Sequence, residues 1–473
     1  KTPLLYYALE SWFVRTTVRE EQIIEINKSI HWHPDHMRDG RMGNFLETMK
    51  DWAISRNRFW GTPLPVWHCL NGHQVCVGSR KELVHLSTDK HYAKEVELHR
   101  PYIDDVELEC PECKSDMQRV PYVLDCWFDS GMMHTAQWHM PFENQETWEQ
   151  QFPADFICEG QDQTRGWFYT LLVTSTLLYP DRPFPHPYRH CLVTGMGLDK
   201  DGKKMSKSRG NVLHPMELVE EFGADALRWY LFSGSAPWRD RPLTRDETSR
   251  VLHSFINTIV NLHNFYALYG NIDGFDVEQH LVPLEERSLL DRWLISRVHN
   301  TAQQVVKSLD GYDLVPATRA IGDLVEDFSN WYVRVSRDRF WGEGLSEDKK
   351  QGYSTLHEGL LALSHLMAPF MPFLAESLYQ ELGGTGESVH LSQYPEGDAQ
   401  YIDEELEREM DLARRIVSLG RNARQSCGVK VRQPLNAITV QHERTGLQGE
   451  IEALVKSELN VKNVEFTSEN VRN

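Results

Sequence analysis

The spacing of apolar residues changes near residue 288, and this change limits the chain to few folds. Before it, short apolar segments at 155–158 and 191–194 flank an apolar stretch at 164–178 that is long enough for a helix. An acidic turn at 159–162 separates the first segment from that helix. Buried strands that alternate with helices favour a parallel sheet covered by helices, so this part of the chain is predicted to be α/β.

After residue 288 the apolar residues recur at intervals of three and four, which is the period of an amphipathic helix. The repeating positions are Leu290, Trp293, Leu294, Val298, Ala302 and Val305, then Ile321, Leu324, Val325, Phe328, Trp331 and Val335, then Leu356, Leu360, Leu363, Met367 and Phe370. A last helix is predicted over 403–425. One apolar stripe on each helix indicates a helix bundle.

Composition excludes several classes of protein. The 473 residues correspond to about three domains. With 40% hydrophobic and 25% charged residues, the chain is not a disordered tail, a collagen-like fibre or a small disulfide scaffold. Its apolar runs, such as 171–178, are far shorter than the ~20 residues of a transmembrane helix, so no membrane association is expected. The net charge of −19 means that any nucleic-acid contact needs a local basic patch.

The cysteines and the first residues bear on the compartment. Eight cysteines spread over the chain indicate free thiols and one candidate metal site in a reducing compartment, so we expect a cytoplasmic protein. The start at Lys1 has neither the basic nor the apolar region of a signal peptide and runs directly into strand-like sequence at 11–16. This start is typical of a piece of a longer protein.

A loop rich in lysine and hydroxyl groups follows the segment at 191–194. It spans 199–211 and reads DKDGKKMSKSRGN. Ammonium groups in such a loop can neutralise the phosphates of a nucleotide in a transition state, although a solvated basic turn is the ordinary alternative. The loop is not a Walker loop, and Gly195 and Gly197 lack the third glycine of a dinucleotide fingerprint.

Residues 204–208 (KMSKS) resemble the lysine-loop motif of class I aminoacyl-tRNA synthetases. Residues 51–61 (DWAISRNRFWG) resemble the isoleucyl, valyl and leucyl subgroup of that family. The blocks at 330–341 (NWYVRVSRDRFW), 387–391 (ESVHL) and 430–435 (KVRQPL) are similar to isoleucyl-tRNA synthetases in particular. The resemblance covers nearly the whole chain and implies part of a class I Rossmann-type parallel sheet, followed by an all-α anticodon-binding helix bundle.

The same resemblance implies a division into domains. The expected parts are the C-terminal half of the catalytic domain at 1–68 and 124–215, a small cysteine-containing insert at 69–123, a stem at 216–287, the anticodon-binding bundle at 288–400 and the start of a C-terminal junction region at 401–473. No HIGH-type motif and no editing domain are recognisable, so we expect this chain to lack half of the ATP site and to be inactive alone.

Enzymes of this kind activate isoleucine with ATP and Mg²⁺, release pyrophosphate and transfer the acyl group to tRNA(Ile). The resemblance assigns Lys207 to the ATP phosphates, with Lys204 and Ser208 as further catalytic residues of the loop. A loop-shaping role is the alternative for Lys204. Isoleucine, ATP and tRNA(Ile) are the expected partners, and a monomer is expected.

The block from Glu159 to Gln163 matches the family segment that lines the aminoacyl-adenylate pocket. Glu159 and Gly160 are expected at the carboxyl end of a strand, where α/β sheets bind ligands. Asp162 and Gln163 would orient the amino acid, and Trp167 could form a wall of its pocket. Helix N-capping is the alternative for the two acidic residues, and core packing is the alternative for Trp167.

Two groups of residues are candidates for binding tRNA, because guanidinium groups and aromatic rings suit an RNA strand. They are Arg56, Arg58 and Trp60, and, near two tryptophans of the bundle, Arg334, Arg337 and Arg339. The helix at 403–425 could form a second surface with Arg408, Arg414, Arg415, Arg421 and Arg424. Structural ion pairs are the alternative for Arg56 and Arg58. A solvated or salt-bridged helix face is the alternative for the arginines at 334, 337 and 339.

A zinc site is possible in the cysteine-containing insert. Cys110 and Cys113 form a Cys-x2-Cys pair, and Cys69 lies upstream of them. Many relatives add a complete second pair, which is absent here, so His73 or Cys76 would have to supply the fourth ligand. The alternative is a knuckle that packing alone stabilises.

Two other functions remain open. A valyl-tRNA synthetase shares the tryptophan–glycine and lysine-loop blocks. A non-catalytic tRNA-binding module would use the lysine loop only as an electrostatic clamp.

Overall fold

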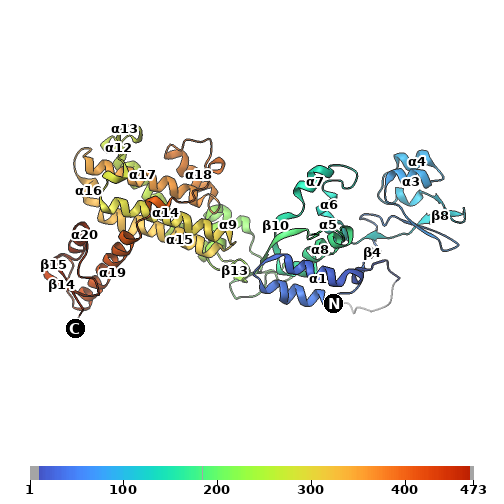
Figure 1. Ribbon diagram of the computed structural model, residues 1–473, viewed down its shortest axis with the longest axis horizontal. Helices are drawn as coiled ribbons and strands as arrows, with labels where there is room; N and C mark the ends of the chain where they lie inside the picture. The colour runs from blue at the N-terminus through green and yellow to red at the C-terminus, as the bar shows by residue number, and fades with distance from the viewer. Residues whose placement is uncertain (1–9, 184, 469–473) are drawn as a thin grey trace. The chain divides into compact units, whose positions relative to one another are not determined.

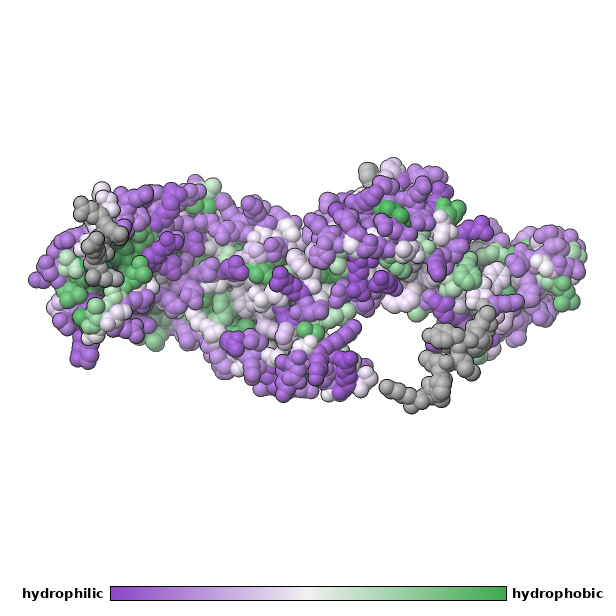
Figure 2. All heavy atoms as spheres, turned by 90° about the horizontal axis from the view of Figure 1, so that it is seen from below, coloured by the Kyte–Doolittle hydropathy of each residue, from purple (hydrophilic) through white to green (hydrophobic). Residues whose placement is uncertain are grey.

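The computed structural model describes residues 10–183 and 185–468. The chain forms two compact units, residues 1–196 and 197–473, which are described here one at a time. Hydrophilic residues cover most of the face in Figure 2, and apolar residues occur there as separate small patches. Within the described ranges, no helix is both long enough and apolar enough to cross a membrane.

A parallel sheet of three strands lies at the centre of unit 1. The strand order is β10 (Ala154–Gly160), β11 (Tyr188–Thr194) and β2 (His31–His33). Alternate residues of the sheet, including Trp32 and Cys191, are buried in one core with α1 (Glu20–Ser29) and α8 (Trp167–Leu178), and Figure 1 shows both helices. The sequence therefore predicted the parallel α/β arrangement correctly, since parallel strands need helices as crossover connections.

The two strands of the sheet that had been predicted from apolar segments differ in burial. In β11, Cys191, Leu192 and Val193 are all buried. In β10 only Ile157 is buried, while Phe156 is 42% exposed. The strand predicted at 155–158 is present, but the prediction that it is buried was wrong. The face that carries Phe156 and Cys158 is exposed to solvent.

Shorter elements complete the rest of unit 1. The helical elements are η1 (Thr16–Arg19), η2 (Arg38–Met42), α2 (Gly43–Leu46), α5 (Cys126–Gly131), α6 (Met133–Ala136), α7 (Gln145–Gln151) and η4 (Gln161–Arg165). Two short antiparallel strand pairs are also present. One joins β1 (Phe13–Val14) and β3 (Trp52–Ala53), and the other joins β4 (Ser55–Arg56) and β9 (Val123–Leu124). The strand expected at 11–16 is thus reduced to two residues, and Thr16 already belongs to η1.

The cysteine-containing insert has its own antiparallel sheet and its own core. The strand order is β6 (Gln74–Cys76), β5 (Val66–Cys69), β8 (Asp116–Arg119) and β7 (Leu108–Glu109). Its helical elements are α3 (Arg80–Leu86), α4 (Lys90–Glu95) and η3 (Tyr102–Asp105). Trp67 is buried in this core and donates a hydrogen bond from its indole to the Val106 carbonyl at 2.7 Å.

Unit 2 begins with a short pair of parallel strands and a group of helices. The elements are β12 (Gly197–Leu198), which pairs with β13 (Arg241–Pro242), then η5 (Lys207–Arg209), α9 (Pro215–Phe222), α10 (Ala224–Ser233), α11 (Arg245–Arg250), η6 (Val251–Ile256), α12 (Asn257–Asp273), α13 (Val277–His280) and η7 (Leu284–Glu286).

The helix bundle follows, and its helices begin at the capping residues that the sequence provides. Ser288 caps α14 (Leu289–Asp310), Ser346 caps α17 (Glu347–Met367) and Asp403 caps α19 (Glu404–Ser426) with side-chain oxygens that accept backbone N–H groups. The other elements are α15 (Leu314–Glu326), η8 (Asp327–Val333), α16 (Arg337–Trp341), α18 (Pro372–Glu381), η9 (Val389–Leu391) and η10 (Ala399–Tyr401). The predicted apolar stripes pack together in one core, as α14, α15 and α17 in Figure 1 illustrate.

A small βαβ unit closes the described part of unit 2. It consists of β14 (Leu435–Gln441), α20 (Gly449–Leu459) and β15 (Val461–Thr467), and the two strands pair in parallel. Helix α19 packs against α20. The predicted domain boundaries stay predictions, because the division at residues 196 and 197 is the one that the structure defines.

Candidate functional site

The residues predicted to hold the aminoacyl-adenylate gather at the carboxyl end of β10 in unit 1. Glu159 is exposed, pairs in register with Val193 of β11, and is followed directly by Gly160. A Cβ on Gly160 would lie 2.8 Å from Asp162 Oδ1, so glycine at this position lets the Asp162 carboxylate approach the strand. This edge is where parallel sheets bind ligands, and it presents the exposed carboxylate of Glu159.

Gln163 and Trp167 are held in place by hydrogen bonds. Gln163 Oε1 accepts the backbone N–H of Trp167 at 2.9 Å, while its amide donates to Asp162 Oδ2 at 3.3 Å. The Trp167 indole donates to the Ser130 carbonyl at 3.2 Å. Gln163, rather than either acidic residue, therefore caps α8, so the N-capping alternative does not apply to Glu159 or Asp162.

Sequence reasoning missed Trp127. A Cβ on Gly166 would lie 3.3 Å from the Trp127 ring, and this ring is 40% exposed next to the start of α8. Trp127 thus lies beside the predicted adenylate residues. Its position in α5, forty residues earlier in the chain, gives no local signal of this proximity.

The lysine loop in unit 2 is a hairpin that its own polar residues hold together. Asp199 Oδ1 accepts the backbone N–H of Lys203 at 2.8 Å, and Asp199 Oδ2 accepts the Asn211 amide at 2.7 Å. Asn211 Oδ1 in turn accepts the backbone N–H of Ser206 at 3.0 Å. The hydrogen bond from Asn211 is the main reason why the pKa of Asp199 is lowered. The charged form of Asp199 therefore fixes the base of the loop.

The lysine side chains of this loop are exposed to solvent. Lys204 and Lys207 are exposed, and neither forms an ion pair with any acidic residue in the described ranges. Ser208 is also exposed, and its hydroxyl lies 3.3 Å from the Ser206 hydroxyl. Such a loop can bring two ammonium groups to a polyphosphate. Glu159 belongs to unit 1 and the lysine loop to unit 2, so each is described within its own unit.

The first group of predicted tRNA-binding residues divides into paired and exposed side chains. Arg56 forms an ion pair with the buried Asp125 and donates a hydrogen bond to the Ala53 carbonyl at 2.7 Å. These contacts fit the alternative to RNA binding, a structural ion pair. Arg58 is exposed. Trp60 is 72% exposed and stacks on His99 with ring centroids 5.2 Å apart. An open indole of this kind can stack on a base.

The second group divides in the same way. Arg339 donates two hydrogen bonds to the fully buried Asp291, at 2.8 and 2.9 Å, so the structural alternative describes this residue as well. Arg334 pairs with Glu458 and lies over the Trp331 ring. Arg337 is exposed and forms no ion pair with any residue that the structure describes.

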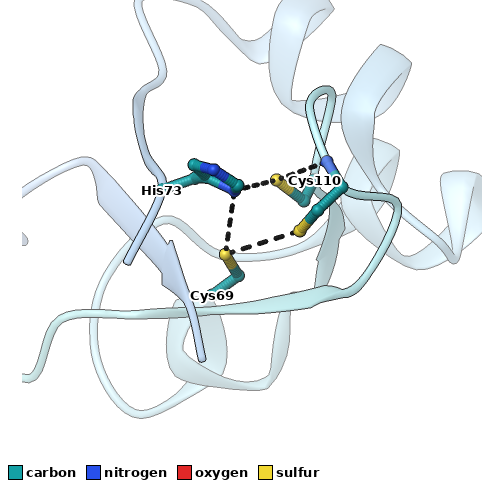
Figure 3. Close-up of side chains that lie close together, drawn as sticks. Cys69, His73 and Cys110 are labelled. Atoms are coloured by element: carbon teal, nitrogen blue, oxygen red, sulfur yellow. Dashed lines mark hydrogen bonds between the residues drawn. The ribbon is translucent and has the colours of Figure 1, made fainter. Parts of the chain in front are cut away.

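Three cysteines and one histidine form a compact cluster in the insert (Figure 3). Nδ1 of His73 lies 3.5 Å from the sulfurs of both Cys69 and Cys110, and Cys69 Sγ lies 3.8 Å from Cys113 Sγ. Of the two residues predicted as possible fourth ligands, His73 joins the cysteines, whereas the exposed Cys76 does not. Hydrogen bonds from Ser115 and Asn71 lower the pKa of Cys113 to about 5, which favours the thiolate.

Two family models match this chain. One describes class I tRNA synthetases (I, L, M and V) and matches residues 4–243, which is more than half of the chain. The chain belongs to the class I tRNA synthetases. The second model, an anticodon-binding domain of tRNA ligases, matches residues 291–439 and so covers most of the bundle together with α19.

Most of this chain is also similar to individual isoleucine–tRNA ligases. An isoleucine–tRNA ligase from Clostridium acetobutylicum is 45% identical over 470 residues, which cover 98% of this chain and 44% of the relative. One from Bacillus thuringiensis is 47% identical over 464 residues, again 98% of this chain and 44% of the relative. The chain therefore spans less than half the length of these relatives. A leucyl-tRNA synthetase from Agrobacterium radiobacter K84, solved with tRNA and LeuAMS, shares the fold with a TM-score of 0.57 at 20% identity, over 78% of this chain and 46% of that one.

Proposed function

We propose that this chain forms part of an isoleucine–tRNA ligase, which activates isoleucine with ATP and Mg²⁺ and transfers it to tRNA(Ile). The observation that carries the proposal is the similarity of 98% of the chain to isoleucine–tRNA ligases at 45–47% identity. A valyl-tRNA synthetase is the other enzyme that the sequence motifs leave open.

Each part of the site has a proposed task. Lys207 binds the ATP phosphates, and Lys204 and Ser208 assist it as the α-phosphorus is attacked, because that step needs neutralised charge more than a proton transfer. Glu159 and Gly160 hold the adenylate. Asp162 and Gln163 orient isoleucine beside Trp167. The free ammonium groups of the loop and the exposed carboxylate at the sheet edge support this assignment.

Isoleucine-dependent exchange between ATP and pyrophosphate, by the protein that carries this chain, tests the proposal. Exchange with isoleucine that exceeds exchange with valine by about 10–200-fold is expected, since the two side chains differ by one methylene group. Equal or faster exchange with valine would assign the chain to the valine enzyme. Binding of tRNA without any exchange would instead identify a tRNA-binding module.

tRNA(Ile) is the proposed RNA partner. Arg58, Trp60, Arg334 and Arg337 are the proposed contacts from the sequence, and the ion pairs of Arg56 and Arg339 favour a structural role for those two side chains. We further propose that the protein is a cytoplasmic monomer. All eight cysteines are free, which suits a reducing compartment, and light scattering measures the oligomeric state.

The cysteine–histidine cluster fits a zinc ion. Bonds of about 2.3 Å to sulfur and 2.0–2.1 Å to nitrogen in a tetrahedron place two sulfurs about 3.8 Å apart and a sulfur and a nitrogen about 3.5 Å apart. One sulfur–sulfur pair and two sulfur–nitrogen pairs of the cluster have these separations, and all four ligand atoms lie within 4.8 Å of one another. Zinc at Cys69, His73, Cys110 and Cys113 would stabilise the insert. One equivalent of zinc by mass spectrometry, lost in Cys110→Ser, is expected, whereas equal zinc content in both proteins would contradict the proposal.

A further inference from the structure

A groove lined by arginines runs beside α19 in unit 2. Its volume is about 560 Å³, which lies within the ~300–1,000 Å³ of ordinary ligand pockets. Its charged and aromatic lining residues are Trp331, Arg334, Asp411, Arg414, Arg415 and Arg421, and Asp411 lies 3.7 Å from Arg414. We call this feature the α19 groove.

The sequence of α19 explains one wall of the groove. Polar residues at 411, 414, 415, 418, 421 and 422 follow the helical period and lie on one face, while Ala413, Ile416 and Gly420 are buried on the other. The opposite wall is η8, a π-helical turn, and such turns are frequent at functional sites. There the buried Trp331 carries the Arg334 guanidinium 5.3 Å above its ring centre.

The arginines of the groove differ in how far acidic residues neutralise them. Arg414 pairs with the buried Asp327 at 2.6 Å. Arg334 and Arg421 share one carboxylate, that of Glu458 in α20. Arg415 is exposed and forms no ion pair within the described ranges, and Nε of Arg421 is buried without a hydrogen-bond partner there. The groove therefore keeps positive charge and unused donors in a chain whose net charge is −19.

We propose that the α19 groove binds the phosphate backbone of a single-stranded RNA segment, with Arg415 and Arg421 as the phosphate contacts. The proposal rests on the proposed tRNA-binding function and assigns one surface to it. Guanidinium groups suit phosphates because their planar fork donates two parallel hydrogen bonds. The guanidinium plane of Arg334, supported by the indole below it, offers a base a surface to stack on.

Glu458 sets the strength of this site. Because its carboxylate neutralises both Arg334 and Arg421, an RNA phosphate must compete with it for the same guanidinium groups. Glu458 is thus a positioning residue that weakens RNA binding. Removing its charge should strengthen binding, which is the opposite of the effect expected from removing an arginine.

Fluorescence anisotropy of this chain with the labelled anticodon stem–loop of tRNA(Ile), at several KCl concentrations, tests the proposal. Arg415→Ala should bind about tenfold more weakly, and the slope of log affinity against log salt should fall by about 0.7, as for one lost phosphate contact. Arg415→Lys should lie between the two. Glu458→Gln should bind about threefold more tightly, provided that its melting temperature shows a folded protein.

Arg250→Ala is the matched control, because Arg250 is an exposed arginine of unit 2 on α11 that pairs with Glu247 one turn away. Its affinity should stay within about twofold of wild type. Equal affinities for Arg415→Ala and Arg250→Ala, or no gain with folded Glu458→Gln, would overturn the groove proposal. Tighter binding of polyglutamate than of RNA would overturn it in favour of an acidic peptide. If the wild-type chain binds no tRNA(Ile), the proposed function fails as well.

Discussion

Replacing Arg339 with alanine should destabilise unit 2 rather than remove a direct RNA contact. The side chain of Arg339 is only 10% exposed, and its partner Asp291 is fully buried. Both carboxylate oxygens of Asp291 accept hydrogen bonds from the guanidinium, and the hydroxyls of Tyr332 and Ser288 also donate to them. Without Arg339, a buried carboxylate that links α14, η8 and α16 would lose its counter-charge.

The size of the effect follows from this burial. Removing one partner of a buried ion pair costs about 3–5 kcal/mol, because the other charge remains in a medium that solvates it poorly. For a unit of this length, each kcal/mol corresponds to about 2–4 °C of melting temperature, so Arg339→Ala should lower the transition of unit 2 by about 6–20 °C. Differential scanning calorimetry measures this shift and separates the transitions of the two units.

The neighbouring Arg337 provides the control for this prediction. It lies on α16 too but is exposed, so Arg337→Ala should change the stability by no more than about 0.5 kcal/mol. Adding Asp291→Asn to Arg339→Ala should recover part of the loss, since the amide carries no buried charge. A melting temperature of Arg339→Ala within about 2 °C of wild type, together with weaker tRNA binding, would refute the structural role and restore Arg339 as an RNA contact.

Three further substitutions test other parts of the chain. Lys207→Ala should slow isoleucine-dependent pyrophosphate exchange by about 10²–10³-fold without lowering the melting temperature, and an unchanged rate would remove the lysine from the mechanism. Burial lowers the pKa of the His134 imidazole to about 4. As the pH falls, the unfolded chain therefore binds a proton at His134 before the folded chain does. The free energy of unfolding should thus fall by up to about 3 kcal/mol from pH 6.5 to pH 4. Urea unfolding of His134→Gln should lack this part of the pH dependence. Gly359→Ala places a Cβ 2.4 Å from Phe328 Cζ, so thermal unfolding should show a loss of about 1–3 kcal/mol, and wild-type stability would mean that the ring moves aside freely.

Local patterns predicted the elements of the fold. The intervals of three and four in the bundle report which side of each helix faces the core, and the helices α14, α17 and α19 lie where these intervals place them. The same holds for β10, β11 and α8, since strand and helix periods are properties of neighbouring residues. The helix predicted over 403–425 is α19, and Asp403 caps it by accepting the Leu406 backbone N–H.

Features that depend on contacts between residues far apart in the sequence could not be predicted from it. The apolar run at 155–158 could not reveal that one face of its sheet is open, because burial depends on what else covers the strand. Nothing near Arg339 in the sequence indicates Asp291, which lies 48 residues away. His73 could be named only as one of two possible ligands, since its approach to Cys110 depends on how two strands of the insert pair.

The arginines of α19 show why residue type alone does not identify an RNA surface. Arg424 is buried and donates to four backbone carbonyls, among them those of Leu459 and Asn460, so it joins α19 to the βαβ unit. Arg414 neutralises a buried aspartate, and Arg408 pairs with acidic residues one turn away. In an acidic chain most guanidinium groups find a carboxylate or a carbonyl. We therefore expect a phosphate to bind best where such a partner is lacking, and on this helix Arg415 is the exposed arginine without an ion pair among the described residues.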